Sequence, residues 1–158
     1  MALTILLIDS DEERGRALAE KLAGFARVLR ADGADLAAEV EAARPDLIII
    51  DMSLPDRDAL EDIRTVAAAN PVVMFAGTDD PEFARQAIAA GVCSYNLSGV
   101  AYADIKPIMA SAIALFQRYR HVETELAAAR ALLEERRLIE RAKAILMRDR
   151  KMTEPEAY

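Results

Sequence analysis

The chain has 158 residues, 53% of them hydrophobic and 30% charged, and a net charge of −7. This length holds one well-packed domain and a smaller appendage, and the composition excludes an intrinsically disordered chain. No apolar run reaches the ~18–20 residues that cross a bilayer, no basic segment marks a secretory signal, and the single cysteine rules out an internal disulfide. We therefore expect a cytoplasmic protein with no membrane contact.

Short apolar runs alternate with helical patterns along the first two thirds of the chain. The expected strands cover residues 3–8, 27–30, 47–50, 72–75 and 94–97. The expected helices cover residues 12–24, 36–44, 60–68, 81–90 and 104 onward. Continuous β-rich runs are typical of strands buried on both faces. Their alternation with helices predicts an α/β domain in which a doubly wound parallel sheet of five strands lies between two helical layers.

The last predicted helix extends well beyond the end of a small α/β domain. Apolar residues follow one another at steps of four and three residues, with no glycine or proline among them: Ile108, Ala112, Leu115, Tyr119, Val122, Leu126, Ala129 and Leu133. Pro107, just before them, suits the first turn of a helix. An apolar seam on a projecting helix needs a partner, which predicts a coiled-coil homodimer through Leu115, Tyr119, Val122, Leu126 and Leu133. A helical hairpin that folds back on the domain is the alternative.

Acidic residues stand where the first and third predicted strands end. Asp9 ends the first strand and is followed by Ser10 and Asp11, and Asp51 ends the third. In a doubly wound sheet of order 2-1-3-4-5 these two strands are neighbours, and ligands bind outside their carboxyl ends. Carboxylates that converge there suit a hard cation such as Mg²⁺, and a carboxylate beside such an ion can accept a phosphoryl group. The sequence predicts an acidic pocket made by Asp9, Asp11 and Asp51.

Three stretches together resemble the response regulator receiver family. They are residues 6–9, 45–55 and 90–95, which read LLID, PDLIIIDMSLP and AGVCSY. The resemblance covers about residues 3–117 and implies a flavodoxin-like receiver domain. It also implies that Asp51 is the phosphoacceptor and that Leu54 and Pro55 belong to the loop after it.

The chain departs from the receiver pattern at three places. Ser10 stands where the family has a second acid, Ala76 where it has a serine or threonine, and Ser98 where it has a lysine. The resemblance implies that the missing groups bind the metal, hold the phosphoryl oxygens and neutralise their charge. We therefore expect a pocket used for partner sensing or weak cation binding, with a vestigial pocket and conventional phosphorylation as alternatives. No cofactor is expected to be required, and any binding of Mg²⁺ should be weak.

Charge is unevenly distributed along the chain. Residues 1–117 carry 10 basic and 19 acidic side chains, whereas residues 118–158 carry 10 basic and 8 acidic. At helical spacing one stripe is basic, made by Arg137, Arg141, Arg148 and Lys151, and another is apolar, made by Leu138, Ala142, Ile145 and Met152. Arginine suits phosphate contacts, and its guanidinium plane can stack on RNA bases. A merely solvated charged face is the alternative.

Residues 136–147, which read RRLIERAKAILM, resemble the core signature of the ANTAR family, with Ala144 in place of the usual glycine. The resemblance implies a small helical module that binds tandem hairpins in leader RNA and prevents transcription termination. The expected RNA-binding residues are Arg136, Arg137, Arg141, Lys143, Arg148 and Lys151. Thr153 through Glu156 predict the N-cap and first turn of a further helix. The family pattern continues past Tyr158, so we expect an incomplete module.

The sequence therefore predicts three parts: a receiver-like domain over 1–105, a coiled-coil linker helix over 106–131 and a partial ANTAR module over 132–158. The predicted function is that of an atypical response regulator that acts as an RNA-binding transcription antiterminator and does not bind DNA. Likeness to the NasT-type antiterminators of nitrate assimilation implies control by a partner sensor protein that sequesters it. A protein-interaction scaffold without RNA binding is the alternative. An enzyme is disfavoured, because no Gly/Ser-rich phosphate cradle and no nucleophile–base pair are found.

Overall fold

The computed structural model describes residues 3–53, 57–99 and 102–158. It divides into two compact units, Met1–Gln117 and Arg118–Tyr158. Within the described ranges, none of the helices combines the length and the apolar character that a bilayer crossing requires. Leu54 and Pro55, which carry part of the resemblance noted above, lie outside the described residues.

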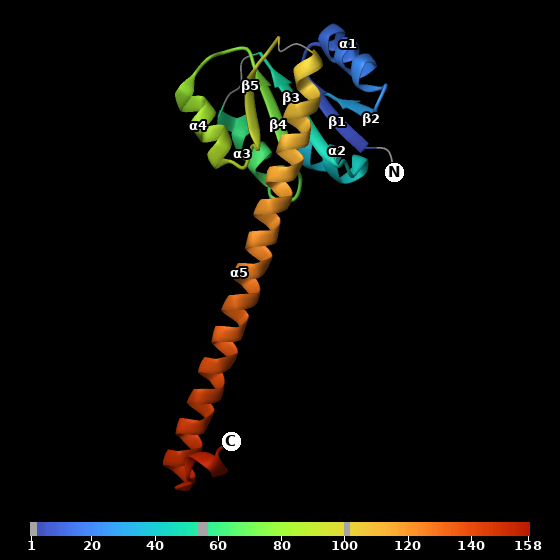
Figure 1. Cartoon of the computed structure of the whole chain (residues 1–158). Helices are drawn as coiled ribbons and strands as arrows, with labels where there is room; N and C mark the ends of the chain where they lie inside the picture. Colours follow the sequence, from blue (N-terminus) through green and yellow to red (C-terminus); the bar gives the residue numbers. More distant parts are fainter. Residues whose placement is uncertain (1–2, 54–56, 100–101) are drawn as a thin grey trace. The chain divides into compact units, whose positions relative to one another are not determined.

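The first unit is built on a single sheet of five parallel strands (Figure 1). The strands are β1 (Leu3–Asp9), β2 (Ala26–Ala31), β3 (Leu47–Met52), β4 (Val72–Ala76) and β5 (Ser94–Leu97). Their order is β2-β1-β3-β4-β5, which confirms the predicted doubly wound fold. The pairing of β1 with β3 sets Asp9 directly opposite Asp51. The two predicted acidic strand ends therefore meet at one edge of the sheet.

Helices cover both faces of the sheet and bury its apolar strands. α2 (Leu36–Ala43), α3 (Arg57–Ala67) and α4 (Pro81–Ala89) lie on one face, and α1 (Glu12–Leu22) lies on the other with the first turns of α5 (Tyr102–Arg150). Successive residues of β3 point to opposite clusters, Ile48 to the first and Ile49 to the second. Because β3 and β4 are covered on both faces, their apolar residues follow one another without alternation.

The helix α5 begins earlier than the sequence suggests. Its first residue is Tyr102, so Pro107 is its sixth residue and lies inside the helix, not in the first turn as expected. Ala112, which the heptad pattern places in the seam, is 1% exposed and packs in the core cluster with Met109. At the N-terminal end of the predicted seam, Ala112 therefore packs against the sheet of the same chain and is not available to a partner helix. The alternative helical hairpin would need a turn, and α5 is one unbroken helix to Arg150.

The second unit consists of the rest of α5 and a short turn after it. Lys151 has a φ of 50° and ends the helix in the left-handed conformation that is common at helix C-termini. The predicted further helix is a 3₁₀ helix of three residues, Glu154–Glu156. The Glu156 carboxylate accepts hydrogen bonds of 2.7 Å from the backbone N–H and the hydroxyl of Thr153, so Thr153 is the N-cap as expected.

Candidate functional site

The acidic pocket at the ends of β1 and β3 contains two of its three predicted carboxylates. Asp9 and Asp51 are 7% and 5% exposed and lie opposite each other in the sheet. Asp11 is exposed and serves another purpose, because its carboxylate accepts a 3.0 Å hydrogen bond from the backbone N–H of Arg14 and caps α1. The sequence therefore located the pocket, but its third acid is a helix cap.

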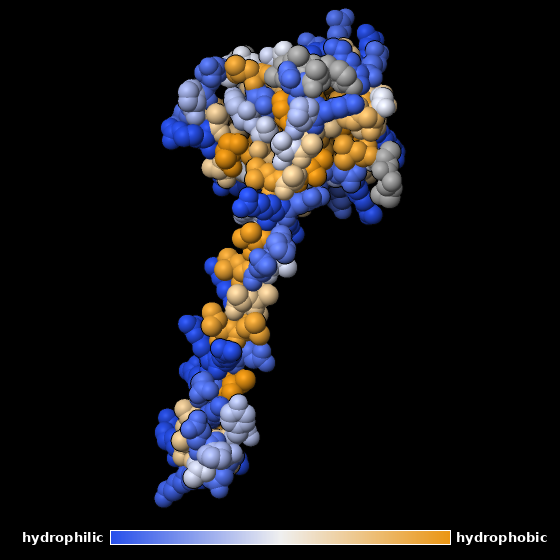
Figure 2. All heavy atoms as spheres, viewed as in Figure 1, coloured by the Kyte–Doolittle hydropathy of each residue, from blue (hydrophilic) through white to orange (hydrophobic). Residues whose placement is uncertain are grey.

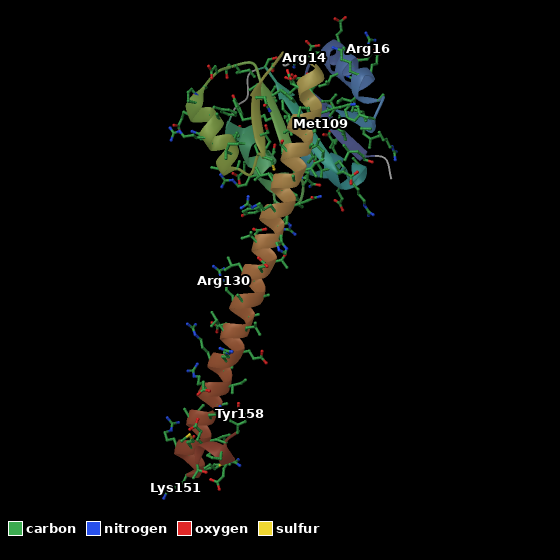
Figure 3. All side chains as sticks on the ribbon, in the orientation of Figure 1. Arg14, Arg16, Met109, Arg130, Lys151 and Tyr158 are labelled. Carbon is green, nitrogen blue, oxygen red and sulfur yellow. The ribbon has the colours of Figure 1, made fainter. Side chains whose placement is uncertain are left out.

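Arg14, labelled in Figure 3, is a pocket residue that no sequence pattern singled out, and its guanidinium contacts both buried carboxylates. The guanidinium of Arg14 donates from Nη2 to Asp9 Oδ1 at 2.7 Å and from Nε to Asp9 Oδ2 at 3.0 Å. Its Nη2 also lies 3.4 Å from Asp51 Oδ1. The sequence feature that could have identified Arg14 is a basic residue in the first turn of a helix that directly follows a strand ending in an acid. A helix N-terminus disfavours a cation, so a basic residue there indicates an acidic partner nearby.

The close approach of α1 to the end of β1 depends on Gly15. A Cβ atom at this position would lie 3.1 Å from the Cβ of Asp9 and 3.3 Å from Nη2 of Arg30. A glycine inside a helix costs stability relative to alanine, so its presence needs a structural reason. The lack of a side chain lets the first turn of α1 lie against Asp9 and brings Arg14 within reach of both acids.

Ser98 replaces the expected lysine and contacts the pocket directly. Its hydroxyl donates a 2.9 Å hydrogen bond to Asp51 Oδ1. Burial raises the pKa of the Asp51 carboxyl above its ordinary value, while the hydrogen bond from Ser98 and the charge of Arg14 act in the opposite direction. The hydrogen bond to Asp9 raises the pKa of Arg14, which stays cationic.

The receiver resemblance implies a bound Mg²⁺, and the residues of this pocket do not fit one. Both carboxylate oxygens of Asp9 accept hydrogen bonds from Arg14, and position 10 holds a serine in place of an acid. Among the described residues, no group of three or more acidic, histidine or cysteine side chains is arranged to hold a metal ion. Mg²⁺ needs several oxygen ligands that are not already engaged with a cation.

The end of β4 differs from the receiver pattern in its hydrogen bonding. Ala76 is fully buried and offers no hydroxyl to the pocket. The hydroxyl of Tyr95 instead donates a 3.1 Å hydrogen bond to the backbone carbonyl of Thr78, and its ring packs against Phe83 with the centroids 6.2 Å apart. These contacts hold Tyr95 in a half-buried position.

Three of the predicted RNA-binding residues form one exposed row on α5. Arg137, Arg141 and Arg148 follow one another at steps of four and seven residues, which keeps side chains within about 40° around a helix. Glu134 pairs with Arg137 at 2.9 Å and Asp149 with Arg148 at 2.8 Å, whereas Arg141 has no ion pair with any residue that the structure describes. We call these three residues the arginine row.

The other three predicted RNA-binding residues lie elsewhere. Arg136 and Lys143 are seven residues apart and share a face about 100–160° from the members of the arginine row. The side chain of Lys143 is only 11% exposed, because it pairs with Glu140 at 3.3 Å and lies 4.0 Å from the ring centroid of Tyr158. Lys151 is beyond the end of α5, so the predicted basic stripe ends at Arg148.

The predicted dimer seam is a line of exposed side chains on α5, and Figure 2 shows that apolar residues, drawn in orange, lie exposed along this helix. Their exposed fractions range from 48% for Leu126 to 60% for Tyr119, with Leu115, Val122 and Leu133 between them. Five residues after Leu133 the next apolar strip begins at Leu138, about 140° further around the helix. α5 thus presents two apolar faces, the seam and a second strip that contains Leu138 and Ile145.

Comparisons with known proteins agree with the two-part architecture. The response regulator receiver domain family matches residues 5–97, and the ANTAR domain family matches residues 127–158. The transcriptional regulatory protein PdtaR of Mycobacterium tuberculosis is 32% identical over 129 residues, which cover 80% of this chain and 63% of PdtaR. The chain therefore spans less than two thirds of the length of the curated relatives it matches.

Solved structures share the fold of the first unit. A response regulator from Thermotoga maritima superposes with a TM-score of 0.64 at 16% identity, over 72% of this chain and 99% of that one. The BeF3-activated N-terminal receiver domain of RstA from Klebsiella pneumoniae gives a TM-score of 0.62 at 22% identity, over 70% and 97% of the two chains. With this fold, the acidic strand ends and both family matches, the chain belongs to the response regulator receiver family and carries an ANTAR domain at its C-terminal part.

Proposed function

We propose that this chain is an RNA-binding transcription antiterminator that works as a homodimer and is controlled by a partner protein. The observation that carries the proposal is the exposed arginine row within the segment that the ANTAR family matches. Guanidinium groups in a row can neutralise phosphates and stack on unpaired bases of RNA hairpins. The description of PdtaR as a transcriptional regulatory protein supports a regulatory function.

The homodimer forms through the seam from Leu115 to Leu133. Two copies paired in this way present two arginine rows to two hairpins of one leader RNA. Binding of the first hairpin raises the effective concentration of the second, so the dimer holds a tandem-hairpin RNA far more tightly than a single module does.

A sensor protein, and not phosphorylation, supplies the main input. Arg14 already engages both acids of the pocket, and Ser10, Ala76 and Ser98 stand in place of the usual phosphorylation machinery. The likeness to NasT-type regulators supports a partner of the nitrate-sensing kind, which sequesters the chain until its effector binds.

Filter binding of a tandem-hairpin leader RNA at a low and a high salt concentration tests the RNA interaction. Arg141→Ala should weaken binding about 10- to 100-fold and lower the salt slope by about one, as expected for one lost guanidinium contact. Arg118→Ala is the matched control, because it removes an equal charge from an exposed position of the same helix that lies about 100–140° from the arginine row and before the residues that the ANTAR family matches. Equal losses in the two variants, or no binding above a salt-labile background, would refute the proposal.

A protein-interaction scaffold is the second candidate function. Two members of the arginine row, Arg137 and Arg148, are already paired with neighbouring acids, as in an ordinary solvated helix face. The second apolar strip with Leu138 and Ile145 is also exposed and suits a protein partner. The scaffold function would be supported if the chain binds no RNA and Leu138→Ser abolishes its binding to a protein partner.

A further inference from the structure

The acidic pocket holds a cation that belongs to the chain itself. Arg14 makes two parallel hydrogen bonds to Asp9, at 2.7 and 3.0 Å, and the same guanidinium reaches Asp51 Oδ1 at 3.4 Å. Its Nη1 donates to the hydroxyl of Ser53 at 3.3 Å. One side chain from α1 therefore connects the carboxyl ends of β1 and β3.

Burial makes such a cation necessary. Asp9 and Asp51 are almost fully buried and occupy paired positions on neighbouring strands. Two ionised carboxylates in this environment repel each other and lose their hydration, so a positive charge between them is needed to keep both of them ionised. A guanidinium keeps its charge at any physiological pH, and its planar fork matches a carboxylate at two points.

We propose that Arg14 is the resident counter-cation of the pocket: it takes the position that a divalent ion would otherwise need between Asp9 and Asp51 and keeps the pocket closed to such an ion. A metal ion could bind only after the fork leaves Asp9, which breaks two charge-assisted hydrogen bonds. The backbone N–H of Asp11 also donates to Asp9 Oδ1 at 2.8 Å, so this carboxylate is held in place from two directions. The proposal concerns the first unit alone and does not depend on RNA binding.

The surroundings of Arg14 support a fixed position. The side chain is one-third exposed, its helix is capped by Asp11 through the backbone N–H of Arg14 itself, and Gly15 allows α1 to lie close to β1. Because the backbone N–H of Arg14 and its guanidinium are both held by hydrogen bonds, the side chain loses little further conformational entropy when it pairs with Asp9. Arg14 is therefore preorganised to pair with Asp9.

Binding of Mn²⁺ to the full chain, followed by electron paramagnetic resonance, tests this proposal. Wild-type protein should bind no Mn²⁺ at millimolar concentration, and Arg14→Gln and Arg14→Ala should each bind one ion, with an affinity that is higher by about tenfold or more. Mg²⁺ should displace the Mn²⁺, and adding Asp51→Asn to Arg14→Gln should abolish the binding. Arg16→Ala, an exposed charge removed from the same helix, is the matched control and should behave as wild type.

Two results would overturn the proposal. In the first, wild-type protein binds Mn²⁺ at millimolar concentration and Asp51→Asn removes that binding, which would mean that Arg14 does not close the pocket. This measurement needs no Arg14 variant, so it holds even if both variants unfold. In the second, Arg14→Gln folds, as judged by a cooperative thermal transition, and binds no more Mn²⁺ than Arg16→Ala. The Tm of each variant with and without Mn²⁺ is an independent measure of ion binding, because an ion that binds only the folded chain raises its Tm.

Discussion

The seam on α5 can be tested by replacing two of its central residues, Val122 and Leu126, with serine. The two side chains are 53% and 48% exposed in the single chain, so roughly half of each remains to be buried by a partner helix. Complete burial of a valine or leucine contributes about 1.5–3 kcal/mol, so each contributes about 1 kcal/mol to the dimer. With both substitutions present in both protomers, the loss is about 4 kcal/mol, or about a thousandfold in Kd.

Sedimentation equilibrium across the micromolar range measures this loss directly. The matched control is Ala127→Ser with Ala131→Ser, which introduces the same two hydroxyls on the side of α5 away from the seam. The control lowers helix propensity at least as much, so far-ultraviolet circular dichroism of both pairs separates helix loss from seam loss. If wild-type protein is a monomer throughout, or if both pairs weaken the dimer equally, the assignment of the seam is wrong.

Three further outcomes follow from the pocket and the last turns of α5. Burial raises the pKa of Asp51, so the ionised carboxylate lowers the stability of the folded chain at pH values above its folded-state pKa. Asp51→Asn should therefore raise the Tm at neutral pH. This increase in Tm should disappear as the pH falls through the folded-state pKa of Asp51. Gly15→Ala should lower the Tm despite a helix-propensity gain of up to about 1 kcal/mol, because the new Cβ meets Asp9 at 3.1 Å; an increase in Tm would show that Asp9 can give way. Lys143→Ala should weaken RNA binding less than Arg141→Ala in the filter assay, because Glu140 and Tyr158 already engage Lys143; equal losses would mean that RNA displaces them.

Much of the fold could be predicted from local patterns in the sequence. The apolar run Leu47–Ile50 predicts a strand buried on both faces, and the structure confirms it as part of β3. The order of strands then sets Asp9 opposite Asp51, because β1 and β3 are neighbours in a doubly wound sheet. Three strands are longer than the apolar pattern predicts: β1, β3 and β4 continue to Asp9, Met52 and Ala76, because these residues pair with the neighbouring strand.

The helices and strands, their order and the periodic faces of α5 follow from local patterns along the chain, because periodicity and turn chemistry depend only on neighbouring residues. Three features depend on how the helices pack on the sheet: Arg14 enters the acidic pocket, Asp11 caps α1 and does not join that pocket, and Ala112 packs in the core. These outcomes depend on which charges and surfaces approach each other across the fold. A buried carboxylate pairs with whichever cation the packing of helices and strands brings within reach. The distance between the two charged groups cannot be read from their separation along the sequence.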